Sequence, residues 1–229
     1  MSKIDQSVKI SEAIWVAFPL AFVGGFLDAH TYIFRGGVFA TAQTGNLVLS
    51  GIHLSLGEFS RARGNLVPIL AFVLGIFLTE VLKKKDYRTS LISWQHRVLL
   101  WEALILLVIG FLPSGVSDAW VTVVISFVSS MQVNSFQRMN HSLFATTMCT
   151  GNLRSATEYL FRFWSEYDFF ALQKFFEYAG VIFVFCLGAA CGAILTELWG
   201  GYALFTCVAI LVVLVSAMLL AERHLEDAK

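Results

Sequence analysis

The chain has 229 residues, of which 57% are hydrophobic and 14% are charged, and its mean hydropathy is +0.72. Soluble domains carry roughly a quarter charged residues, so this composition excludes an ordinary soluble domain and predicts one integral membrane domain. Lys plus Arg equals Asp plus Glu at 16 each, so the net charge gives no indication of a nucleic-acid partner.

Six stretches have the length and apolar content to cross a bilayer, which requires about 20 residues of helix. In chain order they are approximately residues 13–34, 65–83, 97–112, 119–137, 175–196 and 202–221. Two further segments, at about 38–57 and 142–162, follow the first and the fourth of these stretches. Both contain several Thr, Asn and Gln or charged side chains, so they are too polar to face lipid.

Each polar segment contains the same Thr-Gly-Asn-Leu sequence, at residues 44–47 and 150–153. A second match supports a repeat, because GIFLTE at 75–80 resembles GAILTE at 192–197. The chain therefore divides into a first repeat at 1–116 and a second at 117–229 within one membrane domain. A polar break duplicated in two apolar halves is typical of a pathway through a bilayer.

Two topologies compete. If all eight segments cross, the basic residues divide almost evenly between the two sides. If the polar segments enter and leave on one face and the N-terminus is cytoplasmic, only Arg35, Arg61 and Arg63 lie outside. The positive-inside rule favours this second topology, with six spans, two re-entrant segments and both termini cytoplasmic. The cytoplasmic basic residues are then Lys3, Lys9, Lys83, Lys84, Lys85, Arg88, Arg97, Arg138, Arg162, Lys174, Arg223 and Lys229.

Three spans per half is an odd number, so the second half is expected to lie upside down relative to the first. The predicted fold class is an all-α polytopic membrane protein: six transmembrane helices and two re-entrant half-helices in an inverted 3+3 repeat. The re-entrant helices, expected at Leu47–Leu56 and Leu153–Phe161, would begin after Thr and Asn caps and meet near the midplane. Their N–H groups and positive dipole ends would then favour an anion or the negative end of a dipole.

A substrate site is predicted where these helix starts meet, and Asp28 is the candidate for a coupling proton or cation. A carboxylate at membrane depth is costly and usually faces a cavity or a partner. Asp28 has two other interpretations, as a cap of the adjacent re-entrant helix or as an interfacial partner of Arg35. The predicted substrate-binding residues are Gln43, Thr44, Gly45, Asn46, Gln132, Asn134, Thr150, Gly151 and Asn152.

Other sequence features are less specific. His30 and His53 are candidates for a proton relay with Asp28. The GxxxG motif at 188–192 is expected to pack the two halves together, with a homodimer contact as the alternative. The four cysteines lack metal-site spacing, and no catalytic motif is present, so neither a metal, a cofactor nor an enzymatic activity is predicted.

Several motifs are similar to those of a known family. Residues 25–29 (GFLDA), 36–39 (GGVF) and 44–46 (TGN) resemble the signature of the YoaK-like family of small bacterial inner-membrane proteins, a domain of unknown function. The second half is similar around Met131-Gln132 and 150–152, and the resemblance covers about residues 12 to 220. Ser130 and Val133 depart from the family pattern, where Gly and Asn are expected. The resemblance implies a six-span bacterial inner-membrane protein and supplies no substrate.

The predicted function is transport of a small polar or anionic solute across the bacterial inner membrane. The expected partners are the lipid bilayer and a small-molecule or ionic substrate. Two alternatives remain open: an uncoupled channel for a small solute, which needs no ion gradient, and a non-transporting scaffold or sensor, which needs no cavity beside the Thr-Gly-Asn segments.

Overall fold

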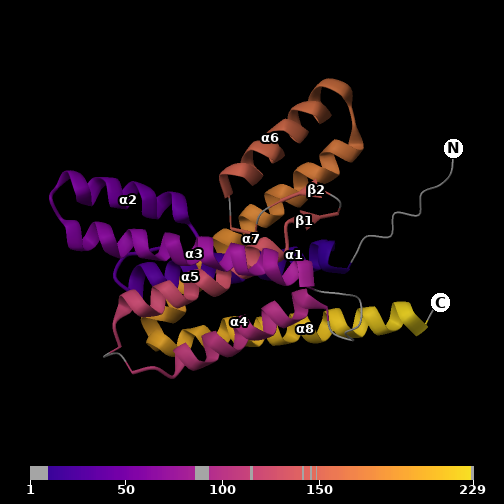
Figure 1. Cartoon of the computed structure of the whole chain (residues 1–229). Coiled ribbons are helices and arrows are strands. Elements are labelled where there is room, and N and C mark those ends of the chain that lie inside the picture. Colours follow the sequence, from indigo (N-terminus) through magenta and orange to yellow (C-terminus); the bar gives the residue numbers. More distant parts are fainter. Residues whose placement is uncertain are drawn as a thin grey trace.

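The computed structural model describes residues 10–85, 93–113, 116–140, 142–144, 146–147 and 149–227. These residues are almost entirely helical (Figure 1). The predicted basic residues Lys3, Lys9, Arg88 and Lys229 lie outside the described residues. The elements are η1 (Ile10–Glu12), α1 (Ile14–Phe34), α2 (Gln43–Ser55), α3 (Phe59–Lys85), α4 (Trp94–Gly110), α5 (Asp118–Ser135), β1 (Arg138–Met139), β2 (Ser142–Leu143), α6 (Cys149–Glu166), α7 (Phe169–Trp199), η2 (Gly200–Ala203) and α8 (Leu204–Asp227).

Each of the six predicted apolar stretches coincides largely with one long helix, namely α1, α3, α4, α5, α7 and α8, and the polar segments form α2 and α6. Two details differ from expectation. The two polar helices begin at Gln43 and Cys149, four residues earlier than predicted, so each Thr-Gly-Asn triplet lies inside the first helical turn. A two-residue antiparallel ladder, β1–β2, also connects α5 to α6 in a fold predicted to be all-α.

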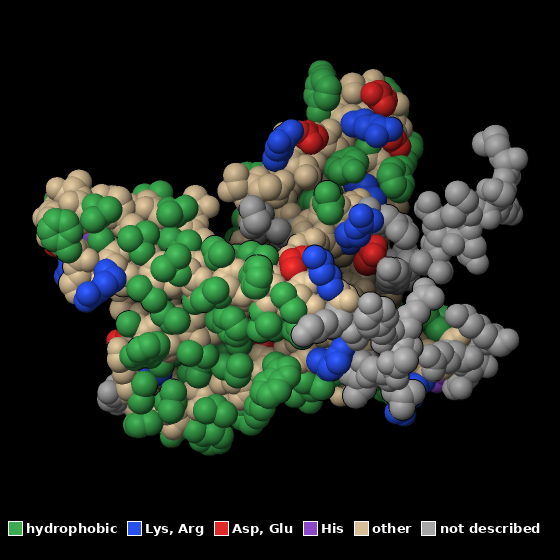
Figure 2. Space-filling model, viewed as in Figure 1, with side chains coloured by type: hydrophobic (Ala, Val, Ile, Leu, Met, Phe, Trp, Pro, Cys, Tyr) green, Lys and Arg blue, Asp and Glu red, His purple; other side chains and the backbone are tan. Residues whose placement is uncertain are grey.

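The surface of the helices is that of a multi-pass membrane protein. Among the described residues, three stretches are long and apolar enough to cross a bilayer: Ile14–Phe34, Phe59–Lys84 and Phe169–Leu225, the last containing α7, η2 and most of α8. On α3, the large side chains Leu70, Leu74 and Phe77 are each more than 60% exposed. Figure 2 shows hydrophobic side chains covering this face, with charged side chains at its borders and at the hairpin tips. Such an apolar surface is stable against lipid and unfavourable in water.

The helices associate in pairs drawn from different parts of the chain. Helix α1 packs along α7, α3 packs along α5, and α4 packs against α8. Helix α2 folds back on α3, and α6 folds back on α7, so that two helical hairpins project from the body of the molecule (Figure 1). In Figure 1, α2 begins near the middle and runs toward the end where α1 finishes, whereas α6 runs toward the opposite end.

Small residues let the paired backbones approach closely. A Cβ atom added to Gly188 would lie 2.1 Å from the Phe22 carbonyl oxygen, and one added to Gly192 would lie 2.7 Å from that of Phe26. The GxxxG motif is therefore used inside the chain, where it packs α7 against α1, as small residues commonly do between membrane helices. In the second pair, a Cβ on Gly75 of α3 would lie 2.4 Å from the carbonyl oxygen of Phe127 in α5.

Candidate functional site

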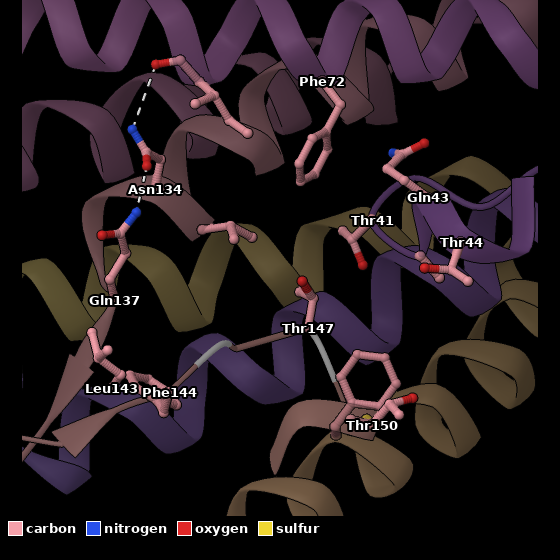
Figure 3. A pocket seen from close by; sticks show the side chains of 15 residues that line it. Thr41, Gln43, Thr44, Phe72, Asn134, Gln137, Leu143, Phe144, Thr147 and Thr150 are labelled. Atoms are coloured by element: carbon pink, nitrogen blue, oxygen red, sulfur yellow. Dashed lines mark hydrogen bonds between the residues drawn. The ribbon is translucent and has the colours of Figure 1, made fainter. Parts of the chain in front are cut away.

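A cavity of about 620 Å³ lies where the first turns of α2 and α6 face each other. Figure 3 shows Thr44 of α2 and Thr150 of α6 at one side of this cavity, with Asn134 and Gln137 at the other. Helices α3, α5 and α7 and the segments that precede α2 and α6 supply the rest of the wall. The lining residues are Thr41, Ala42, Gln43, Thr44, Phe72, Ile76, Val133, Asn134, Gln137, Leu143, Phe144, Thr147, Cys149, Thr150 and Phe185.

Asp28 fixes the start of α2. Its side chain is buried, and Oδ1 accepts hydrogen bonds from the backbone N–H groups of Thr41 at 2.6 Å and Ala42 at 3.3 Å. Its Oδ2 atom accepts a third, 2.7 Å bond from the Thr41 hydroxyl. A carboxylate from α1 thus supplies the acceptors that the free N–H groups before a helix require. Of the interpretations drawn from the sequence, these contacts support the cap of the polar helix.

This cap also explains why α2 begins early. The residue at the N-cap position is Ala42, which has no side-chain acceptor, so the prediction of a Thr or Asn cap was wrong for this helix. The acceptor comes instead from Asp28, on the preceding helix. The predicted pairing of Asp28 with Arg35 is likewise wrong, because Arg35 Nη1 bonds to Asp118 Oδ1 at 3.2 Å.

Asn46 holds the loop that precedes α2. Its Oδ1 atom accepts a hydrogen bond from the Phe39 N–H at 3.0 Å, and its Nδ2 donates to the Phe39 carbonyl at 2.7 Å. Nδ2 also donates to Gln43 Oε1 at 2.9 Å. Because Asn46 is fully buried and both ends of its amide are engaged, it positions the neighbouring residues of the cavity wall.

The start of α6 is held differently. In the second predicted repeat, the position that corresponds to Asp28 is Val133, an apolar residue of the cavity wall. The segment before α6 is anchored through its backbone, because the Tyr178 hydroxyl donates to the Leu143 carbonyl at 2.6 Å and the Phe144 N–H donates to the Gln137 carbonyl at 3.0 Å. Asn152 is buried, as Asn46 is. The site therefore combines a start fixed by a carboxylate with one fixed by backbone contacts.

Asn134, near the end of α5, and Gln137, just after it, connect the cavity to α3. Asn134 Nδ2 donates to Glu80 Oε1 at 2.8 Å, and its oxygen accepts a bond from Gln137 Nε2 (Figure 3). Gln132, two residues earlier, points elsewhere: its Nε2 donates to the Leu20 carbonyl of α1 at 3.3 Å. Of the amide side chains that the structure describes, Gln43, Asn134 and Gln137 line the cavity.

The predicted site residues thus separate into two groups. Gln43, Thr44, Asn134 and Thr150 line the cavity. The others lie outside its wall, namely Asp28, Gly45, Asn46, Gln132, Gly151 and Asn152.

Two further expectations concern histidines. The predicted proton relay with Asp28 is not formed, because His30 Nδ1 lies 3.0 Å from Thr196 Oγ1 and His53 Nδ1 lies 2.7 Å from Glu58 Oε2. Within the part of the chain that the structure describes, no group of three or more His, Cys, Asp or Glu residues is arranged to hold a metal ion.

Several lining residues were not predicted. Phe72, Ile76 and Phe185 come from apolar spans, where the sequence does not distinguish a side chain facing a cavity from one facing lipid. Thr147 and Gln137 carried a usable signal, since Thr147 is a polar residue of the second polar segment and Gln137 ends the span before it. Among the described residues, none that lines the cavity is Lys, Arg, Asp, Glu or His, so these residues offer hydrogen bonding and apolar contact.

The fold and the cavity define a multi-pass helical membrane protein with a cavity of apolar and uncharged polar residues between two helix starts. A family model described as a protein of unknown function (DUF1275) matches residues 16–217, so the chain belongs to the DUF1275 family. The chain is also 25% identical over 142 residues to the UPF0700 transmembrane protein YoaK of Bacillus subtilis (strain 168). That match covers 61% of this chain and 63% of the relative. No solved structure matches the chain.

Proposed function

We propose that the chain is a transporter that carries a small polar solute through the cavity between α2 and α6. The observation behind this proposal is that both copies of the Thr-Gly-Asn segment border one cavity of about 620 Å³. Binding sites at the starts of discontinuous helices are typical of secondary transporters. A scaffold or sensor has no need for such a space between two polar helix starts.

The pairing of the helices supports an inverted repeat with units at 1–116 and 117–229. In the proposed repeat, helices α1 to α4 correspond to α5 to α8. The packing of α1 on α7 then corresponds to that of α5 on α3, and the packing of α2 on α3 to that of α6 on α7. The α4–α8 pair is converted into itself. Helices α2 and α6 run toward opposite ends of the molecule in Figure 1, as an inverted relation requires. In this arrangement α2 and α6 are re-entrant and the other six α-helices are the spans.

The distribution of basic residues supports an orientation in the bacterial inner membrane. Arg35 follows the last residue of α1, and Arg61 and Arg63 lie at the start of α3, just after the α2–α3 turn. The ends of α3 and α8, the start of α4 and strand β1 carry more basic residues, which assigns their side to the cytoplasm by the positive-inside rule. These residues are Lys83, Lys84, Arg97, Arg138 and Arg223.

Asp28 is the proposed coupling residue, acting through the loop that it holds. Protonation would weaken the bonds from Thr41 and Ala42, both of which line the cavity. The start of α2 would then be free to move beside the bound solute. An uncoupled channel predicts the reverse, that flux is independent of a proton gradient and survives Asp28→Asn.

Proteoliposomes test the transport proposal. The purified chain is reconstituted, a panel of polyols, amides, amino alcohols and carboxylates is added outside, and the compounds that enter are identified by mass spectrometry. We expect at least one compound to enter wild-type vesicles and to be blocked by Thr44→Trp or Thr150→Trp, which fill the cavity. Ser55→Trp, on the exposed end of α2, is the matched control. Flux through none of the vesicles, or equal flux with filled cavities, would overturn the proposal.

The inverted topology has its own test. Single cysteines replacing Glu58 and Glu166 mark the tips of the α2–α3 and α6–α7 hairpins. We expect a membrane-impermeant maleimide added to intact cells to label the first and spare the second. Labelling of both sites from the same side would contradict the re-entrant arrangement.

A further inference from the structure

We infer that the solute of this cavity is uncharged and amphipathic, with an apolar body and hydrogen-bonding groups, and that the cavity rejects anions. The inference rests on the proposed transport function and specifies its substrate class. It follows from three features of the described residues: the composition of the wall, the state of the α2 start, and the size of the space.

The wall offers no charge to an ionic solute. The fifteen lining residues include no Lys, Arg, Asp, Glu or His side chain. Phe72, Phe144 and Phe185 present aromatic surface, whereas Thr44 and Gln137 present hydrogen-bonding groups (Figure 3). An ion entering this space would lose its water and gain no compensating partner, which is unfavourable at membrane depth.

The start of α2 is already occupied by a negative group. A free helix N-terminus attracts anions through unpaired N–H groups and the helix dipole. Here the Asp28 carboxylate accepts from the N–H groups of Thr41 and Ala42, so an internal anion takes this place. Asp28 is also separated from the cavity by only one hydrogen bond, through Thr41. Its charge repels a second anion in the cavity.

The volume fits an organic molecule. A space of about 620 Å³ lies within the ordinary range for small-molecule sites, which are mostly apolar with a few placed polar groups. The Asn134–Gln137 pair and the threonine hydroxyls supply both donors and acceptors. Small amides, alcohols and esters with an apolar portion match this combination.

Cys149 provides a direct test, because its side chain lines the cavity at the start of α6. The purified chain is treated with uncharged methyl methanethiosulfonate, with its anionic sulfonatoethyl analogue or with its cationic trimethylammonioethyl analogue. Mass spectrometry of the Cys149 peptide gives each rate, which is divided by the rate of the same reagent with glutathione. Glu166→Cys, at the exposed α6–α7 tip, is the aqueous control.

We expect the uncharged reagent to modify Cys149 about 100-fold faster than either charged reagent after this correction, the ratio that corresponds to the cost of a lone charge at membrane depth. The three reagents should react alike at Glu166→Cys. Thr44→Lys, which places a cation in the wall, should selectively accelerate the anionic reagent. Equal rates at Cys149, or no modification by the uncharged reagent, would overturn the inference.

This experiment is independent of transport. Charge discrimination at Cys149 without flux in proteoliposomes would remove the transport function and leave the ligand class intact. Flux of a carboxylate blocked by Thr44→Trp would do the opposite, since it would support transport and contradict the uncharged solute.

Discussion

The α1–α2 and α5–α6 junctions occupy equivalent places in the two halves of the chain, yet they are built differently. The first is closed by a buried carboxylate, Asp28, and by the Asn46 amide, which together engage the backbone of Phe39, Thr41 and Ala42. The second has Val133 in place of the carboxylate and is anchored through the backbone of Leu143 and Phe144. The two junctions that lead to the Thr-Gly-Asn segments are thus stabilised by different contacts, a carboxylate in the first and backbone hydrogen bonds in the second.

The most direct test of this difference is to replace Asp28 of the first junction with valine, the residue at the corresponding position of the second. Asp28→Val removes the acceptor of three hydrogen bonds and leaves two N–H groups without their partner. We expect a loss of about 3 kcal/mol in the free energy of unfolding, because bonds to charged groups are strong and unsatisfied buried donors are costly. The measurement is unfolding of the purified chain by sodium dodecyl sulfate.

Thr41→Val is the graded control for that change. It removes the hydroxyl bond to Asp28 and keeps the backbone bond, so we expect a loss of about 1 kcal/mol in the free energy of unfolding. If Asp28→Val were no more destabilising than Thr41→Val, the carboxylate would not be the element that closes the first junction.

The difference between the junctions also explains which parts of the fold and of the cavity could be predicted from the sequence and which could not. Apolar length located the six long helices, and the duplicated Thr-Gly-Asn segments located two sides of one cavity. The start of α2 could not be placed, because its cap comes from Asp28, 13 residues before Thr41 in the chain. A pattern read along one segment contains no information on a hydrogen-bond acceptor supplied by another helix.

The aromatic wall was missed for a related reason. Phe72 and Phe185 lie in spans that are apolar on all sides, so helical periodicity gives no direction to the cavity. The polar residues of the two motifs indicated the position of the cavity only in part. Thr44 and Thr150 line the cavity, whereas Asn46 and Asn152 are buried outside its wall. Which member of a polar motif contacts solute is decided by packing, and packing is not encoded in residue type alone.

The two glycines of the Thr-Gly-Asn segments provide a matched pair of substitutions. A Cβ atom on Gly45 would lie 2.9 Å from Cδ2 of Phe39, whose ring is stacked on Tyr32 at 4.7 Å, whereas no atom of the described residues lies within 4 Å of a Cβ on Gly151. Alanine favours a helix over glycine by about 1 kcal/mol, and overpacking costs about 1–3 kcal/mol. We expect Gly151→Ala to be more stable than Gly45→Ala by about 1–2 kcal/mol in the same unfolding experiment. Equal stability would mean that the two triplets are packed alike.

The hairpin tips extend the comparison away from the cavity. At the α6–α7 tip, Asp168 caps α7 by accepting from Phe170 N at 2.9 Å and Ala171 N at 3.3 Å. Asp168→Ala should cost about 1 kcal/mol, as the loss of an N-cap usually does. Hydrogen exchange of the first α7 amides provides the local measurement, and Asp168→Asn, which keeps an acceptor, should recover most of the protection. Unchanged exchange in Asp168→Ala would show that the tip does not depend on this cap.

The α2–α3 tip depends on Glu58 and should respond to pH. The hydrogen bond from His53, assisted by Arg61, holds the pKa of Glu58 below its usual value of 4.5. Because the folded-state pKa is the lower one, the carboxylate stabilises the tip above pH 4.5, and this stabilisation is lost as the pH falls through the folded-state value. Glu58 is exposed at the surface, so the effect should be the smallest of those considered. Hydrogen exchange of the α2–α3 turn should therefore accelerate in acid more in wild type than in Glu58→Gln. If exchange in the two proteins depended on pH in the same way, the stability of the tip would be assigned to the backbone hydrogen bond from Glu58 N to His53 O alone.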